Sequence, residues 1–389
     1  MKSFLLLCPI LFLIHLSICA QLDMKTDNQK SNLIRYEASY IGDFASNITG
    51  GLKTGSVFLG MANIKVGFST ENIGLWKNGE IFINGASTHG NTFSEKLLGD
   101  FQVASNIEAE NHTYLQEFWY KHKFEQFEIT IGLQDLNSEF VTSEFAGTFL
   151  NSSFGIPSLI SDNIPVSIFP LTALGITAQI ILNESFLLRS AVYDGCPESF
   201  EENKYNLGWS LNNNDGFLLF TEFEWATHLS EHPGIFKIGG YYHNHLEESN
   251  EKTGFTETVF SKNYGFYFLA DQTVWLKNEN NSLGVFAQIA ISPSSINIHN
   301  YYLGGGINYS GIFTYKDVLG FAIAHAGFNN SSVGNETTIE TFYKTEIIEN
   351  ICIQPDIQYI INPAGTENKL NNALAAFIRF AINFKKYEY

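Results

Sequence analysis

Residues 351–384 read ICIQPDIQYIINPAGTENKLNNALAAFIRFAINF and contain two runs in which apolar residues alternate with mostly polar ones. A period of two places alternate side chains on opposite faces of a β-strand, so each run is predicted to be a strand with one apolar face. The NPAG segment between the runs, residues 362–365, consists of turn formers and is predicted to end the first strand. An aromatic residue, Phe384, ends the second run.

Strands of this kind occur in soluble β-sandwiches and in outer-membrane barrels. A soluble sheet packs its apolar face on a core, whereas a membrane barrel shows its apolar face to lipid and its polar face to the lumen. Phe384 at the end of the last strand suits the aromatic girdle at a membrane interface. The two strands alone leave both classes open.

The same alternation recurs along most of the chain. In residues 56–68, SVFLGMANIKVGF, the face that carries Asn63 lies opposite a face of Phe, Ala, Ile and Val. We count roughly 14 to 16 such segments, which suits one closed barrel. Two stretches lack the alternation: residues 94–111, predicted to be a loop with a short helix and long enough to fold inward, and residues 137–163. No linker is visible, so residues 33–389 are predicted to form a single domain.

Composition narrows the class of protein and its compartment. The chain has 389 residues, of which 44% are hydrophobic, and a net charge of −18, which argues against nucleic acid as a partner. Residues 1–20 resemble a secretory signal peptide, and the polar residues 21–32 are predicted to be a flexible leader. No later segment has about 20 consecutive apolar residues, so no other helix is expected to span a membrane.

Two cysteines remain after removal of the predicted signal peptide, Cys196 and Cys352. Two cysteines do not make a disulfide framework. They either form one disulfide or are unrelated thiols, and the sequence leaves both open.

Motifs of common enzymes are missing. The chain has no P-loop, GxSxG or EF-hand pattern and no zinc-type histidine pair at helical spacing. Glu222 and Glu224 offer the pair of carboxylates that a glycosidase needs. Alternating carboxylates on one strand face are equally what a polar lumen requires, so the chain is predicted not to be an enzyme and to need no cofactor or metal.

The sequence resembles the OprB-type carbohydrate-selective porins of Gram-negative outer membranes. The resemblance covers nearly all of the mature chain and is carried by the segments GLWKNGEIFINGASTHG (74–90), GDFQVASNIEAEN (99–111), IGLQDLNSEF (131–140), PGIFKIGGYY (233–242), YFLADQ (267–272) and QPDIQYIINPAG (354–365). It implies an all-β fold: a transmembrane antiparallel β-barrel of about 16 strands with inward-folded loops and a short helical insertion. It also implies an outer-membrane location, contact with outer-membrane lipid, and passive diffusion of small neutral carbohydrates. Self-association into a homo-oligomer is left open.

Two features depart from that resemblance. Members of the family that take up glucose are expected to line the constriction with arginines, but the mature chain has only Arg35, Arg189 and Arg379. Five residues, KKYEY, follow Phe384. The identity of the sugar is therefore left open, and so is a general or cation-preferring porin with an acidic lumen. A secreted carbohydrate-binding or glycosidase β-protein is the remaining alternative.

A sugar presents hydroxyl groups that donate and accept hydrogen bonds and a ring face that packs on aromatic side chains. A selective channel therefore needs a waist that offers both, and it must bind weakly enough to release the sugar. Trp275 and Phe286 are considered as stacking rings beside the candidates below. Each candidate has a structural alternative, which is to anchor a loop or to pair with another charge in the wall. The predicted pore-lining or substrate-binding residues are Asn63, Asp100, Asn106, Glu108, Glu117, Trp119, Gln134, Glu222, Glu224, Tyr267, Asp271, Gln288, Gln354, Asp356, Gln358 and Arg379.

Overall fold

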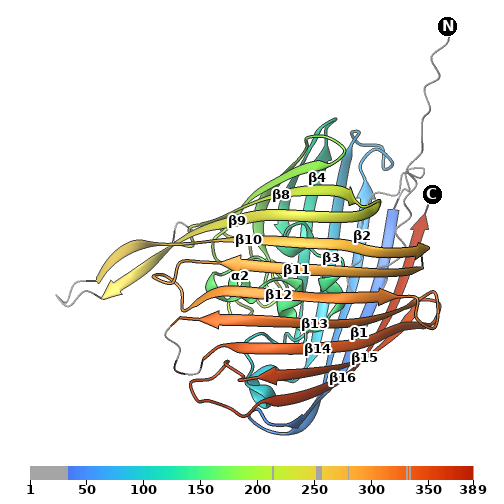
Figure 1. Cartoon of the computed structure of the whole chain (residues 1–389). Helices are drawn as coiled ribbons and strands as arrows, with labels where there is room; N and C mark the ends of the chain where they lie inside the picture. Colours follow the sequence, from blue (N-terminus) through green and yellow to red (C-terminus); the bar gives the residue numbers. More distant parts are fainter. Residues whose placement is uncertain are drawn as a thin grey trace.

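The computed structural model describes residues 34–212, 214–250, 256–278, 280–329, 332 and 334–388. Sixteen antiparallel strands pair in sequence order, and β1 pairs with β16, so the sheet closes into a barrel (Figure 1). The predicted fold class is confirmed. The predicted signal peptide and leader lie outside the described residues. In the part of the chain that is described, no helix is long and apolar enough to cross a membrane.

The strands are long, as a membrane-crossing barrel requires. Their bounds are β1 (Ile34–Thr49), β2 (Gly55–Ser69), β3 (Gly79–Gly90), β4 (His112–Lys123), β5 (Phe127–Gln134), β6 (Ala173–Ile181), β7 (Phe186–Asp194), β8 (Phe217–Leu229), β9 (His232–Asn250), β10 (Thr256–Asn278), β11 (Asn281–Ile291), β12 (His299–Ser310), β13 (Asp317–Phe328), β14 (Glu336–Ile348), β15 (Ile351–Ile361) and β16 (Ala373–Glu388). The short helices are η1 (Ser94–Leu98), η2 (Leu136–Ser138), η3 (Ala146–Thr148), α1 (Ser152–Gly155) and α2 (Ser158–Asn163).

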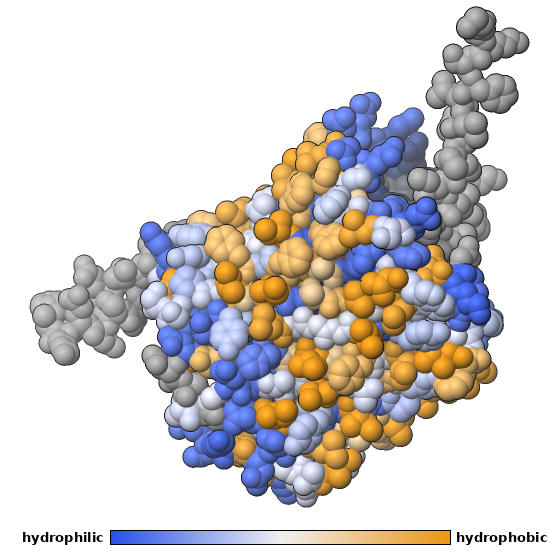
Figure 2. Space-filling model, viewed as in Figure 1, coloured by the Kyte–Doolittle hydropathy of each residue, from blue (hydrophilic) through white to orange (hydrophobic). Residues whose placement is uncertain are grey.

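The alternation in the sequence separates the two faces of the wall. Outward-facing positions are apolar and exposed, and Figure 2 shows hydrophobic residues over the middle of the strands that face the viewer. Examples from neighbouring strands are Ile238, Phe266, Ile289, Ile307 and Phe321. The residues between them face the lumen and are largely polar or small, so the wall is apolar outside and polar inside, as in outer-membrane barrels.

The two ends of the barrel differ. One end carries short turns, such as residues 230–231 and 349–350, and the first residue of β1 lies there beside the end of β16. The other end carries all of the long connections, and the β9–β10 hairpin projects beyond it (Figure 1). Phe384 does not end the last strand as predicted, because β16 continues to Glu388 and Lys385 pairs with Glu37 of β1.

The core of the protein lies inside the barrel, where two long connections fold inward. We call residues 91–111 the first inner loop and residues 135–172 the second inner loop. Phe93 and Leu98 of the first loop, and Phe140, Phe149 and Phe154 of the second, are almost fully buried. They pack on inward-facing apolar side chains of the wall in two hydrophobic clusters. The predicted inward-folded loops and short helical insertion are thus both present.

Candidate functional site

Carboxylates of the wall hold the second inner loop through its backbone. Glu222 on β8 accepts hydrogen bonds from the N–H of Val141 at 2.8 Å and from the Tyr267 hydroxyl at 2.9 Å. Asp271 on β10 accepts from the Ser143 hydroxyl at 2.7 Å and the Glu144 N–H at 2.8 Å. These predicted site residues are buried and fix the loop.

Glu340 on β14 makes the same kind of contact, although the sequence alone did not single it out. It accepts from the N–H groups of Leu150 at 2.6 Å and Asn151 at 3.0 Å. Hydrogen bonds to a charged acceptor are stronger than those between neutral groups. Because such hydrogen bonds occur on β8, β10 and β14, they hold the loop against the part of the wall from β8 to β14.

Amide side chains add further anchors. Gln288 donates to the Phe154 carbonyl at 2.9 Å, Gln354 to the Thr148 carbonyl at 3.0 Å, and Gln358 to the Ala104 carbonyl at 2.8 Å. Each is at most 4% exposed. Asp356, which is 2% exposed, lies beside Gln358. The structure therefore places these four predicted residues beneath the inner loops.

Arg379 and Asp43 form a buried ion pair that also holds the first inner loop. Arg379 Nε and one of its terminal nitrogens donate to the two carboxylate oxygens of Asp43, both at 2.7 Å. The Ser105 hydroxyl donates to the same carboxylate at 2.7 Å. Asp43 is fully buried and Arg379 is 3% exposed.

The two inner loops are bonded to each other. The Asn106 N–H donates to the Leu150 carbonyl at 2.8 Å, and its side-chain amide donates to the Phe149 carbonyl at 3.3 Å. The Ser152 N–H donates to the Val103 carbonyl at 2.9 Å. The loops consequently behave as one insert in the lumen.

Two carboxyls of the first inner loop have raised pKa values. Burial raises the pKa of Asp100 to about 6. Burial also raises the pKa of Glu108 to about 7, and the nearby charge of Asp100 adds to this shift. Glu108 accepts from the Ser94 N–H at 3.1 Å, which closes the loop on itself.

A chain of hydrogen bonds crosses the inner face of β2, β3 and β4. Asn63 donates to Asn84 at 3.1 Å, and Asn84 donates to Glu117 at 3.0 Å. Asn63 also donates to Gln116 at 3.2 Å, which in turn donates to Asp135 of the second inner loop at 3.3 Å. Two predicted residues, Asn63 and Glu117, are thus brought together.

Trp119 of β4 lies next to this chain. Its indole N–H donates to Glu117 at 3.3 Å, and its ring stacks on Phe82 with 4.7 Å between centroids. Lys121 Nζ lies 5.4 Å from the Trp119 ring centroid. Trp119 is partly exposed, whereas Asn63, Asn84 and Glu117 are at most 7% exposed. The accessible groups at this place in the lumen are therefore the Trp119 ring and the Lys121 ammonium beside it, whose side chain is 16% exposed.

The other aromatic candidates do not occupy such a position. Tyr267 is 3% exposed and bonded to Glu222, and Phe286 is 5% exposed among the rings of the second inner loop. Trp275 is 39% exposed on the outer face and stacks on Tyr309, so its prediction as a lumenal ring was wrong. Gln134, also a predicted residue, is 4% exposed and donates to a backbone carbonyl of β6.

Ion pairs link the inner faces of β4 and β5 to the second inner loop. Lys121 Nζ lies 3.0 Å from a carboxylate oxygen of Glu139 in that loop and 3.8 Å from one of Glu128. Lys123 lies 3.8 Å from Glu128. These four side chains are between 16% and 34% exposed.

The series continues across β7, β8 and β9. Arg189 lies 3.9 Å from Glu139, 3.2 Å from Glu222 and 2.8 Å from Glu224. Lys237 lies 3.6 Å from Glu224. We call these eight side chains the ion-pair belt: Lys121, Lys123, Glu128, Glu139, Arg189, Glu222, Glu224 and Lys237.

Sequence reasoning missed six members of the belt, although the inward positions of the five that lie on strands follow from the alternation. Of the eight members, only Glu222 and Glu224 are among the predicted site residues. A search for inward charged residues of both signs on the same strands would have found the five that lie on strands. The pairing itself depends on how the second inner loop brings Glu139 to the wall.

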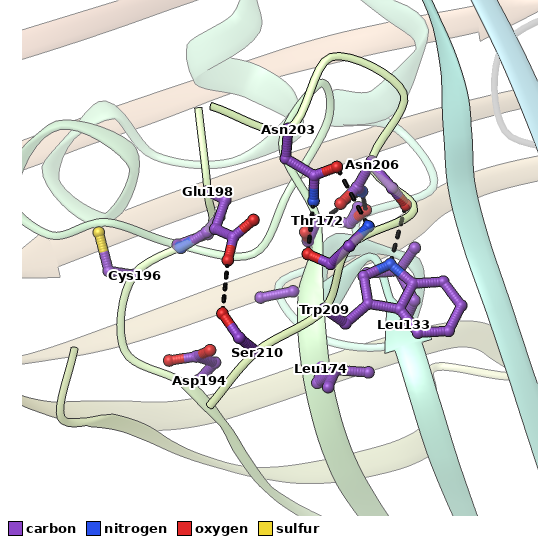
Figure 3. A pocket seen from close by; sticks show the side chains of 13 residues that line it. Leu133, Thr172, Leu174, Asp194, Cys196, Glu198, Asn203, Asn206, Trp209 and Ser210 are labelled. Carbon is purple, nitrogen blue, oxygen red and sulfur yellow. Dashed lines mark hydrogen bonds between the residues drawn. The ribbon is translucent and has the colours of Figure 1, made fainter. Parts of the chain in front are cut away.

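A further loop, residues 195–216, packs against β4 where β4 no longer pairs with β5, because β5 ends at Gln134 and the chain continues into the second inner loop. The Leu115 N–H of β4 donates to the Tyr205 carbonyl at 3.0 Å, and Asn206 donates to the Leu115 carbonyl at 3.1 Å. A cavity of about 20 Å³ lies beside this loop. Figure 3 shows the side chains that line it, among them Ser210, whose hydroxyl donates to Glu198. A single water needs at least about 10–15 Å³, so this cavity is too small for a sugar.

Cys196 lies in the same loop as a free, exposed thiol, so it does not pair with Cys352. No cluster of His, Cys, Asp and Glu side chains suited to a metal ion occurs among the described residues.

Comparisons with known proteins agree with this architecture. The chain is 22% identical to porin B of Pseudomonas aeruginosa, with 90% of this chain and 87% of that protein covered. It is 21% identical to the putative porin QuiX of Acinetobacter baylyi, with 90% and 89% covered. The high-pH structure of Pseudomonas putida OprB superimposes with a TM-score of 0.81 at 18% identity, covering 90% of this chain and 94% of that one.

The profile of the family "Carbohydrate-selective porin, OprB family" matches residues 58–384, which is most of the chain. The barrel and this match place the protein in the outer membrane of a Gram-negative bacterium, as a channel for the passive diffusion of sugars. The chain belongs to the OprB family of carbohydrate-selective porins.

Proposed function

We propose that small neutral sugars cross the barrel along the inner face of β2 to β9, with Trp119 as the ring on which the sugar packs. We call this route the passage. It runs beside the inner loops, whose anchors lie mainly on β8 to β16. The observation that carries the proposal is the partly exposed Trp119 ring next to the chain of Asn63, Asn84 and Glu117.

The chemistry of these groups suits a polyol. The Trp119 ring offers an apolar face, and the partly exposed Lys121 ammonium and Glu139 carboxylate nearby donate and accept hydrogen bonds to hydroxyls. Aromatic contacts of this size contribute about 1 kcal/mol, which is weak enough for rapid release. The anchoring candidates, such as Gln288 and Gln354, act on the sugar only indirectly, by setting the width of the passage.

The test is single-channel recording of the mature protein in a planar bilayer with glucose titrated on one side. Wild-type channels should be blocked by sugar in a saturable way. In Trp119→Ala the apparent dissociation constant for block should rise about fivefold, the value expected for loss of about 1 kcal/mol. The matched control is Trp275→Ala, which removes the same side chain from the outer face and should leave block unchanged. Equal block in wild type and Trp119→Ala would contradict the assignment.

We further propose that the chain has no catalytic step. In support, Glu222 and Glu224, the carboxylate pair of a glycosidase, are both paired with Arg189. The purified protein should therefore release no reducing sugar from glycosides. Self-association remains a prediction, which sedimentation in detergent would measure.

A further inference from the structure

The ion-pair belt has a composition that the chain as a whole does not share. The protein carries 40 acidic residues against 22 basic ones. The belt, in contrast, consists of four cations and four anions, linked in one continuous series from β4 to β9. An average stretch of this chain would give about two anions for each cation, so the balance is a property of the belt that the chain as a whole does not share.

The half of the belt on β4, β5 and the second inner loop lies where a permeating solute would meet it. By register the wall members of the belt face the lumen on β4, β5, β7, β8 and β9, and Glu139 comes from the second inner loop that faces them. Lys121, Lys123, Glu128 and Glu139 remain 16% to 34% exposed. The charges therefore act on the solution in the lumen as well as on each other.

A balanced row of charges has two physical consequences. Its potential falls off much faster with distance than that of a net charge, so neither cations nor anions are concentrated in the passage. Selective ion channels instead use rings of one sign. Alternating ammonium or guanidinium donors and carboxylate acceptors, on the other hand, suit hydroxyl groups, each of which can donate and accept.

We propose that the ion-pair belt is the specificity filter against ions, and that Lys121 and Glu139 are its most sensitive members. This inference rests on the proposed function, because it assigns to the same passage the discrimination between neutral and charged solutes. Removing one charge leaves its partner in excess, and the passage acquires the selectivity of that sign. Removing both members of a pair restores the balance.

The experiment is the reversal potential of channels in a planar bilayer under a KCl gradient. Wild type should show a cation-to-anion permeability ratio near unity. Lys121→Gln should raise the ratio and Glu139→Gln should lower it, each by about tenfold, because one unit charge at about 6 Å in water changes the local concentrations of cations and of anions about threefold in opposite directions. The double variant should return to the wild-type ratio. The control Lys77→Gln makes the same change in an ion pair on the β2–β3 turn, where the lysine is 79% exposed, and should have no effect.

The remaining outcomes distinguish this inference from the proposed function. The belt is not a filter against ions if wild type is strongly cation-selective, or if the double variant stays as selective as a single variant. This holds even if sugar still blocks the channel. If sugar does not block the channel but the reversal potential shifts as predicted, the proposed route of the sugar is wrong, while the assignment of the belt as a filter against ions still holds. If Lys121→Gln fails to fold, Lys123→Gln tests the same pair of strands at a side chain that is 34% exposed.

Discussion

Replacing Asp43 by asparagine should destabilise the barrel by about 3–5 kcal/mol, because it deprives the buried Arg379 guanidinium of the carboxylate to which it is bonded. Asp43 is fully buried and Arg379 is 3% exposed, so water cannot replace the lost partner. Both bonds of the pair measure 2.7 Å, and the Ser105 hydroxyl shares the same carboxylate. Asp43→Asn therefore also weakens the attachment of the first inner loop.

A double variant separates the cost of an unpaired charge from the value of the pair. Replacement of a buried ion pair by apolar side chains of similar size is often neutral or better. Asp43→Leu combined with Arg379→Met should therefore recover at least half of the stability that Asp43→Asn loses. The rest is not recovered because the Ser105 hydroxyl still lacks the Asp43 carboxylate. The free energy of unfolding is measured by urea titration in lipid vesicles, followed by tryptophan fluorescence.

The matched control is Glu80→Gln, which removes a carboxylate from the ion pair with Arg35. These side chains are 23% and 29% exposed, so the loss should stay below about 1 kcal/mol. The reasoning is refuted if Asp43→Asn costs no more than Glu80→Gln, or if the double variant is less stable than Asp43→Asn.

Three other changes test the inner loops and their fit to the wall. The folded chain keeps protons on Asp100 up to about pH 6 and on Glu108 up to about pH 7. Between about pH 4 and about pH 7 it therefore binds more protons than the unfolded chain. The free energy of unfolding should consequently fall as the pH rises through this range. Glu108→Gln should reduce that dependence by at most about 3 kcal/mol, seen as a smaller difference in melting temperature between about pH 5 and about pH 8; an unchanged pH dependence would refute the assignment. Glu340→Gln should weaken the hydrogen bonds that Glu340 accepts from two backbone N–H groups of the second inner loop, by about 1–3 kcal/mol. The loosened loop should raise single-channel conductance. Unchanged conductance would show that the loop is held in place without Glu340. Gly239→Ala places a Cβ 2.2 Å from the Tyr267 ring and should lower the free energy of unfolding in urea by about 1–3 kcal/mol. An unchanged free energy of unfolding would mean that the ring can move aside.

The sequence was sufficient for the wall of the barrel because the signal is local. A strand has a period of two whatever it pairs with, so outward and inward faces can be assigned without knowing the partner strand. The inner loops were found for the converse reason, since residues 94–111 and 137–163 lack that period. The last strand shows the limit of this approach: hydrophobicity ends at Phe384, whereas backbone pairing with β1 continues to Glu388.

Trp275 shows how a local irregularity defeats the pattern. Strict alternation from Asp271 and Thr273 would point Trp275 into the lumen. A bulge between Thr273 and Trp275 sets two residues against one on β11, which turns Trp275 to the outer face. No residue type in this stretch reveals the extra position.

The sequence by itself determined which residues form strands, which face of each strand is apolar, and where two loops interrupt the pattern, because these properties follow from the period of two. The resemblance to the OprB-type porins then implied that the strands close into a membrane barrel. Only the tertiary structure decided which inward polar residues anchor and which line the passage. Glu222 and Gln288 meet backbone groups 81 and 134 residues away in the chain, and Lys121 meets Glu139 only because the second inner loop folds back on β4. Such contacts depend on the path of a loop through the lumen, and the period of a strand contains no information about that path.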